Sequence, residues 1–257
     1  MSPQKYIEVC FSPLLFPAAL QGNEIIVVID VLRASSSIAA AIGNGVKKIV
    51  PVAGIDECFS YREKGYLLAG ERKGIKVSGF DLGNSPFDFM NANLKGAQIA
   101  MTTTNGTQAV QLAKNTDKVI FGCFLNLNYL VSWLQTQNQP IICLCAGWEN
   151  KFNMEDTLFA GALVHHLKGH YGLSDNCDAS IAAEQLYIAA KNDLYAFLEN
   201  SSHRKRLAKL NIDEDVKYCL TPNQLQVIPI MENGAIVKLN PQHLEMPELN
   251  VHSIENK

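Results

Sequence analysis

Glu24-Ile25-Ile26-Val27-Val28-Ile29-Asp30 is the stretch that decides the fold. Its five consecutive β-branched apolar residues favour a strand buried on both faces, because a strand with one solvated face would alternate with polar residues. The alanine-rich segment 34–44 follows and is typical of a packed helix, with Gly45 as its stop signal. A doubly covered strand followed by a helix indicates an α/β fold.

Short β-rich runs continue to alternate with helical stretches along the chain. Further strands are predicted over 48–52, 98–101, 118–122 and 140–145, and helices over 56–64, 108–114, 127–135, 156–170, 180–193 and 194–210. Near the end, two apolar runs, 226–230 and 235–239, flank the turn sequence Glu232-Asn233-Gly234, which is typical of a hairpin. The sequence therefore predicts a three-layer α/β/α fold with a central sheet that is largely parallel but mixed.

The chain length fits one large domain or two intimate lobes, since 257 residues can bury a substantial core either way. We treat residues 1–257 as a single domain, in which the strongly helical segment 174–210 forms a lid or a side lobe. Residues from 241 onward are expected to be a loosely held tail.

Composition limits the partners and the compartment. The net charge of −3 provides no basic footprint for nucleic acid. No apolar run reaches the roughly 20 residues needed to span a bilayer, so no membrane partner is expected. The seven cysteines are scattered without a CxxC pair, and the first six residues lack a signal-peptide core. We expect a cytoplasmic protein without a structural zinc site; assembly into a homo-oligomer stays open.

Ligands in open α/β sheets bind beyond the carboxyl ends of the strands, so the residues that follow each strand are the candidates for a site. Asp30 ends a very apolar strand, where a buried carboxylate needs a metal ion or a chemical role to justify its cost. Arg33 lies three residues further on and carries the planar fork that suits an oxyanion. A helix-capping Asp with a surface Arg is the structural alternative.

Two glycine-bracketed segments come next, Gly70-Glu71-Arg72-Lys73-Gly74 and Gly79-Phe80-Asp81-Leu82-Gly83-Asn84-Ser85-Pro86. The first brings an acid and a base together, although an exposed turn explains it equally well. The second gathers a carboxylate, an amide and a hydroxyl within five residues, although an Asx-turn is a close alternative. The candidate residues here are Glu71, Arg72, Asp81, Asn84 and Ser85.

The stretch Thr102-Thr103-Thr104-Asn105-Gly106-Thr107 joins a predicted strand to a predicted helix. Backbone N–H groups, the helix dipole and the threonine hydroxyls all favour an oxyanion at such a junction, and Gly106 permits close approach. A capped helix after a buried strand is the alternative. Thr103, Thr104, Asn105 and Gly106 are the candidate ligand-binding residues.

The last candidate segment follows the strand 140–145 and contains Ala146-Gly147 and the acidic pair Glu155-Asp156. Asn153 and Asp156 form an approximate capping box, while either carboxylate of the pair is suited to a metal ion. The usual phosphate-loop, dinucleotide, nucleophile-elbow and HExxH motifs are missing from the sequence. Carboxylates and arginines at strand ends therefore indicate Mg²⁺-assisted chemistry on a small, multiply charged anion, without fixing the reaction.

These segments, in this order, resemble the 2-phosphosulfolactate phosphatase family. The resemblance runs from about residue 5 to residue 240, and its specific motifs lie between about 30 and 156. Lys73 departs from the family pattern, in which a glycine is often expected. The resemblance implies a Mg²⁺-dependent phosphatase that hydrolyses 2-phospho-3-sulfolactate to 3-sulfolactate and phosphate, which in methanogens is a step towards coenzyme M.

On this hypothesis Asp30 binds Mg²⁺ together with Glu155 or Asp156. The loop 103–106 holds phosphoryl or sulfonate oxygens. Arg33 and Arg72 neutralise the remaining anionic groups, and Glu71 orients Arg72 or activates water. Direct attack by water and phosphorylation of Asp30 both stay open. The alternatives are a phosphatase for another 2-phospho-hydroxyacid and a non-catalytic protein that binds a phosphorylated or sulfonated acid.

Overall fold

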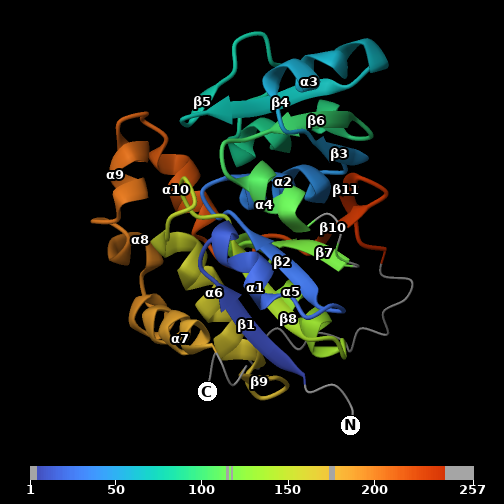
Figure 1. Cartoon of the computed structure of the whole chain (residues 1–257). Helices are drawn as coiled ribbons and strands as arrows, with labels where there is room; N and C mark the ends of the chain where they lie inside the picture. The colour runs from blue at the N-terminus through green and yellow to red at the C-terminus, as the bar shows by residue number, and fades with distance from the viewer. Residues whose placement is uncertain (1–4, 114–115, 117, 174–176, 241–257) are drawn as a thin grey trace.

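The strand predicted around residues 24–30 lies inside an eleven-stranded mixed sheet in the computed structural model, which describes residues 5–113, 116, 118–173 and 177–240 (Figure 1). Along the sheet the order is β5 (Ile75–Lys76), β4 (Leu67–Arg72), β6 (Gln98–Thr102), β3 (Lys48–Pro51), β11 (Ala235–Lys238), β10 (Pro229–Glu232), β7 (Lys118–Gly122), β2 (Ile25–Ile29), β8 (Ile141–Cys145), β1 (Tyr6–Cys10) and β9 (Gly172–Leu173).

Helices connect these strands. The α-helices are α1 (Phe16–Ala19), α2 (Ala34–Gly43), α3 (Ile55–Ser60), α4 (Gly106–Ala113), α5 (Leu127–Gln135), α6 (Met154–Leu167), α7 (Asp178–Ala190), α8 (Leu194–Phe197), α9 (Ser202–Ala208) and α10 (Asp213–Cys219). The 3-10 helices are η1 (Pro13–Leu15), η2 (Arg62–Lys64), η3 (Pro86–Met90), η4 (Ala92–Leu94) and η5 (Phe124–Asn126). The predicted α/β alternation is confirmed.

The hairpin near the end of the chain makes the sheet mixed. β10 and β11 pair with each other antiparallel, and each pairs antiparallel with its outer neighbour, β7 or β3. On either side of this hairpin the strands pair in parallel, as β4-β6-β3 and as β7-β2-β8-β1-β9. The short β5 pairs antiparallel with β4 at one edge. The prediction of a largely parallel but mixed sheet is therefore confirmed.

Strand β2 is buried on both faces, as its composition predicts. Its residues Ile25, Val27 and Ile29 pack in a core that contains residues of α5, α6 and α7. Ile26 and Val28 belong to a second core, which contains residues of α1, α2 and α4. Because each face carries its own apolar layer, the backbone of β2 is held firmly, and the residue that follows it, Asp30, has a fixed position.

The helical segment after residue 177 differs from the prediction in two respects, the first being α10, which lies beyond the predicted helices. A single helix over 194–210 was expected, but α8 ends at Phe197 and α9 begins after Ser201. The Ser201 side chain accepts a hydrogen bond from the N–H group of Arg204, 3.2 Å away, and this N-cap starts a new helix. The predicted tail from residue 241 lies outside the described residues.

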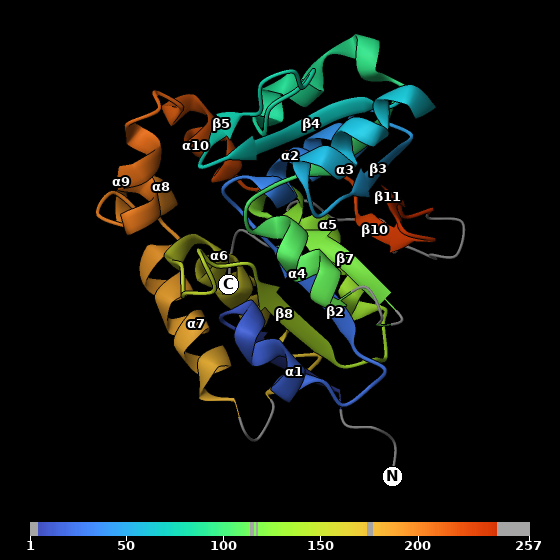
Figure 2. The same ribbon diagram turned by 45° about the horizontal axis from the view of Figure 1, so that its top comes forward.

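Helices α9 and α10 lie beside the ends of β4 and β5, at one edge of the molecule (Figures 1 and 2). Side chains join them to the sheet: Asp215 of α10 forms a buried ion pair with Arg33, and the Leu210 side chain packs against Gly74. Whether this segment is a separate lobe stays a prediction. Among the described residues, none of the helices has the length and apolar character required to cross a bilayer.

Candidate active site

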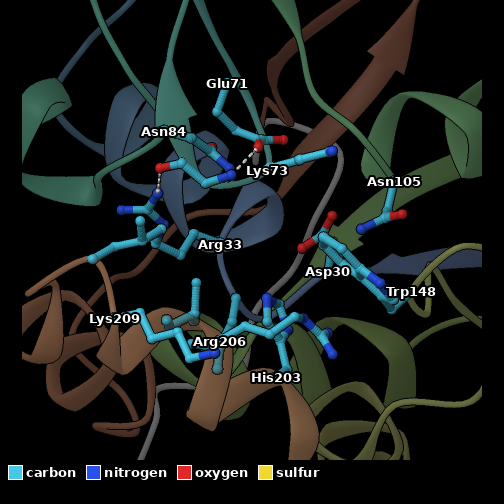
Figure 3. Close-up of a pocket in the computed structure, with 14 residues that line it drawn as sticks. Asp30, Arg33, Glu71, Lys73, Asn84, Asn105, Trp148, His203, Arg206 and Lys209 are labelled. Carbon is cyan, nitrogen blue, oxygen red and sulfur yellow. Dashed lines mark hydrogen bonds between the residues drawn. The ribbon is translucent and has the colours of Figure 1, made fainter.

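A cavity of about 240 Å³ opens between the sheet and these helices (Figure 3). Two of its walls are formed by different parts of the chain. The strand-end wall is made of residues at or after the ends of β2, β4 and β6, with Asn84: Asp30, Arg33, Glu71, Lys73, Gly74, Asn84 and Asn105. The helical wall comes from α9 and the turn after it: His203, Arg206, Leu207, Lys209 and Leu210. Leu32 and Trp148 complete the lining. The expectation that the site lies beyond strand ends agrees with this position.

Asp30 follows directly after β2, and 8% of its surface is exposed. Its Oδ1 accepts a hydrogen bond from the N–H group of Ala34 at 3.3 Å, which also places it at the start of α2. Burial raises the pKa of Asp30 to about 6, although the Ala34 hydrogen bond and the nearby His203 act in the opposite direction. A carboxyl group whose pKa is raised in this way, at the wall of a cavity, is typical of a functional site.

Glu71 ties together two loops of the strand-end wall. Its Oε2 accepts a hydrogen bond from the N–H group of Gly74 at 2.6 Å, and its Oε1 accepts one from the N–H group of Thr104 at 2.7 Å. The loops that follow β4 and β6 are thus fixed to each other through one buried carboxylate. The Thr104 N–H group, one of the donors expected to face an oxyanion, is therefore directed at Glu71.

Arg33 reaches the cavity with part of its donor set already used. Its Nη1 pairs with Oδ2 of Asp215, and its Nη2 donates to the Gly74 carbonyl at 3.1 Å. Asp215 also accepts a hydrogen bond from the Ser85 hydroxyl at 2.9 Å. Arg33 therefore fastens α10 to the strand-end wall as well as lining the cavity.

Residues of the loop 103–106 line two cavities of different size. Asn105 lines the cavity, and its Oδ1 accepts a hydrogen bond from the N–H group of Glu149 at 3.2 Å. Thr103 and Gly106 line a smaller cavity of about 20 Å³ that also reaches Asp30. The Thr104 hydroxyl is buried without a hydrogen-bond partner among the described residues. Thr103 and Gly106 of this loop therefore lie close to Asp30.

Three other candidates lie away from the cavity lining. Arg72 donates to the Glu71 carbonyl at 2.7 Å and to the Thr102 hydroxyl at 3.0 Å. Asp81 pairs with Arg62 at 3.4 Å and accepts the N–H group of Leu68 at 2.8 Å. Ser85 caps η3 and binds Asp215. The contacts of these residues organise the loops around the site.

Glu155 and Asp156 start α6 and are fully buried. Both Asp156 oxygens accept hydrogen bonds: Oδ1 from the N–H group of Val31 at 2.8 Å, and Oδ2 from Gly147 N at 3.1 Å and Asn153 Nδ2 at 2.9 Å. Burial, with the charges of Asp30 and Glu155, raises the pKa of Asp156 well above its usual range. Asp156 thus joins the segments after β2 and β8.

Glu155 connects the acidic pair to the helical wall. Its Oε1 contacts Nδ1 of His203, and its Oε2 is buried without a hydrogen-bond partner among the described residues. The His203 ring packs against Trp148, with 5.5 Å between ring centroids. Within the described part of the chain, no three His, Cys, Asp or Glu side chains are grouped as a ready-made metal site.

Sequence reasoning missed the whole helical wall, together with Trp148 and Lys73. One signal was present: Ser202-His203-Arg204-Lys205-Arg206 gathers four potential cations within a chain whose net charge is negative. Their direction could not be read from the sequence, because the helix boundary at Ser201 decides which of them face the cavity.

Comparison with known proteins identifies the family of this chain. A family model described as 2-phosphosulpholactate phosphatase matches residues 10–234. The chain belongs to this family. A relative from Caldanaerobacter subterraneus subsp. tengcongensis, named a probable 2-phosphosulfolactate phosphatase, is 38% identical over 215 residues, covering 82% of this chain and 89% of that protein.

Two further relatives carry the same name. The protein from Thermotoga petrophila is 39% identical over 211 residues, which cover 82% of this chain and 90% of the relative. The protein from Pseudothermotoga lettingae is 35% identical over 228 residues, which cover 89% and 98%. The family resemblance inferred from the motifs is confirmed. Family membership makes the chain a phosphoric monoester hydrolase by class.

Proposed function

We propose that this chain is a Mg²⁺-dependent phosphatase that hydrolyses 2-phospho-3-sulfolactate to 3-sulfolactate and phosphate. The observation that carries the proposal is the position of Asp30, a buried carboxylate at the wall of a small cavity that is otherwise rich in cations. The cavity volume of about 240 Å³ lies just below the usual range for drug-sized ligands, which suits a three-carbon acid.

The carboxylate side chains at the site suit Mg²⁺, because this ion prefers oxygen ligands. Proteins bind this ion through one or two carboxylates plus substrate phosphate and water, rather than through a full protein cage. Asp30 at the cavity and the unpaired Oε2 of Glu155 are the carboxylate oxygens that meet this description. Asp156 supports the site through its hydrogen bonds instead. When bound, Mg²⁺ neutralises charge on phosphoryl oxygens.

The other residues of the strand-end wall orient the substrate and hold the wall rigid. The Asn84 side chain lines the cavity, and its Oδ1 has no hydrogen-bond partner among the described residues. We expect Asn84 and Asn105 to bind substrate oxygens. Glu71 keeps the two loops fixed, and Arg33 presents a cation whose position Asp215 determines. This preorganisation keeps the cost of orienting the substrate low.

The test is phosphate release from 2-phospho-3-sulfolactate, measured with Mg²⁺ and after removal of metal by a chelator. We expect release with Mg²⁺, its loss with the chelator, and recovery when the ion is restored. A panel of other 2-phospho-hydroxyacids identifies the preferred substrate, and a clear preference for another acid would replace the one proposed. Binding of the intact phosphorylated acid without release of phosphate in Mg²⁺ would refute the enzyme.

The proposal extends to the pathway implied by the resemblance, coenzyme M formation. The attacking group is tested separately by quenching turnover of substrate labelled in the phosphate. Label retained on wild-type protein and lost in Asp30→Asn would assign a phosphoenzyme at Asp30. Absence of label above background would assign direct attack by water.

A further inference from the structure

Arg206 is a cation of the helical wall with two buried donors that lack a partner within the described part of the chain. Its Nε and Nη2 atoms are both buried, and neither has a hydrogen-bond partner among the residues described. Buried donors that lack a partner are uncommon in folded proteins, and unpaired charged donors are the most costly kind. Arg206 also lines the cavity, so its guanidinium group is placed beside any anion bound there.

The two unpaired nitrogens form one edge of the guanidinium group. The Cζ atom of Arg206 lies 4.1 Å from the centroid of the Trp148 ring, so one face of the group is used in a cation–π contact. Nε and Nη2 are on the same side of the planar group, away from Cδ, and their N–H bonds can meet two oxygens of one anion. The contact with Trp148 therefore fixes the orientation of a guanidinium group that carries two adjacent N–H donors.

The neighbouring arginines differ from Arg206 in having carboxylate partners, although Nη1 of Arg204 is also buried without a hydrogen-bond partner among the described residues. Arg33 is paired with Asp215 and with the Gly74 carbonyl. Arg204, two residues from Arg206 on α9, is paired with Asp213 at 3.1 Å and lies over the Tyr195 ring at 3.7 Å. Arg206 has no carboxylate partner within the described part of the chain, and the exposed Lys209 adds a second cation to the same wall.

Figure 3 places Arg206 and Lys209 on the opposite side of the cavity from Glu71 and Asn84. A substrate whose phosphate group is at Asp30 would extend its remaining charged groups towards the other parts of the lining. We propose that the guanidinium group of Arg206 binds one of the two non-phosphate anionic groups of the substrate, the carboxylate or the sulfonate. This inference rests on the proposed function and adds to it the residue that selects an acid with an anionic group besides its phosphate.

The experiment compares Arg206→Met and Arg206→Lys with Lys205→Met, which removes an exposed cation of the same helix outside the cavity lining. Calorimetry on the Mg²⁺-loaded protein measures the Kd of 3-sulfolactate and that of inorganic phosphate. We expect Arg206→Met to raise the Kd of 3-sulfolactate by about 10- to 100-fold and to change that of phosphate by less than about twofold. Arg206→Lys should lie between, because it keeps the charge without the fork.

Kinetics with 2-phosphosulfolactate and 2-phospholactate then distinguish the two anions. A KM raised by Arg206→Met for the sulfonated substrate alone assigns the sulfonate, and a KM raised for both assigns the carboxylate. If Arg206→Met proves unstable in a melting experiment, Arg206→Lys supplies the same comparison with the side-chain stem retained.

Equal Kd values for wild type and both Arg206 variants would overturn the inference, as would an equal loss of phosphate affinity. Failure of the proposed function has a different signature. In that case wild-type protein releases no phosphate from either substrate, while the 3-sulfolactate titrations still report on Arg206.

Discussion

The two walls of the cavity are built in different ways. The strand-end wall consists of buried side chains fixed by short hydrogen bonds, as in the contacts of Glu71 with Gly74 and Thr104. The helical wall carries cations on α9, a helix of seven residues, and is tied to the sheet through Arg33 and Asp215 on the neighbouring α10. On the proposed function, this difference assigns the chemistry to the rigid sheet and recognition of the second anionic group to an attached helical segment.

The largest expected effect follows from changing the carboxylate of the strand-end wall. Asp30→Asn keeps the size of the side chain and removes its charge, so we expect kcat to fall by about 10³-fold or more. Steady-state phosphate release measures this effect. Glu199→Gln, at an exposed position, is the matched control and should retain full activity. Wild-type kcat in a folded Asp30→Asn protein would remove Asp30 from the chemistry.

Most of the strand-end wall could be predicted from the sequence, whereas the helical wall could not. Asp30 and Asn105 follow predicted apolar strands, Glu71 lies near the end of β4, and strand ends of an α/β sheet converge on a site whatever the details of packing. The helical wall is held at the cavity by contacts between residues far apart in the chain: Glu155 and His203 are 48 positions apart, and Arg33 and Asp215 are 182 positions apart. No local pattern encodes such pairings.

The same reasoning explains what was uncertain among the candidates on the strand-end side. Arg72 and Glu71 are adjacent in the sequence, and alternation along β4 sends their side chains in different directions, so Glu71 lines the cavity and Arg72 contacts Thr102. Asp156 was grouped with Glu155 by composition, but its two oxygens are used by backbone and amide donors.

The attachment between the walls is tested next. Asp215→Ala leaves Arg33 buried without its partner and removes the acceptor of the Ser85 hydroxyl, so we expect the free energy of unfolding to fall by about 3–5 kcal/mol. Denaturant titration measures the change. The exposed pair Arg62–Asp81 is the control, because Arg62→Ala should cost less than about 1 kcal/mol. Similar losses in both variants would mean that the buried pair has no special role.

A third prediction concerns pH and the strand-end wall alone. Burial raises the pKa of Asp30 from 3.8 to about 6, so the folded protein binds this proton more tightly than the unfolded chain does. The contribution of Asp30 to the free energy of unfolding therefore decreases as pH rises from about 4 to 6, by about 3 kcal/mol in total.

Denaturant unfolding of metal-free wild type and Asp30→Asn at pH 4.5 and 7.5 measures the effect, since contributions from other groups largely cancel in the difference. The variant should gain stability relative to wild type at the higher pH. If the difference in unfolding free energy between wild type and Asp30→Asn does not change with pH, the raised pKa of Asp30 is contradicted.

The smallest expected effect comes from the close packing around Asp30. A Cβ atom at Gly106 would lie 3.0 Å from Oδ2 of Asp30 and 2.9 Å from Cβ of Ala34. We therefore expect Gly106→Ala to cost about 1–2 kcal/mol of stability and to lower kcat about tenfold. Gly169→Ala is the control, because a Cβ there meets no atom within 4 Å. Equal melting temperatures and equal activities of the two variants would show that the loop 103–106 can move to accommodate the added methyl group.

The central claim is that the two walls divide catalysis and recognition between them. Its most direct test is to measure kcat for 2-phosphosulfolactate and the Kd of 3-sulfolactate for Asp30→Asn and Arg206→Met under the same conditions. We predict that Asp30→Asn loses at least about 10³-fold in kcat with a Kd within a few-fold of wild type. Arg206→Met should raise the Kd at least about tenfold and keep kcat at saturation within about threefold. Loss of the same parameter in both variants would contradict the claim.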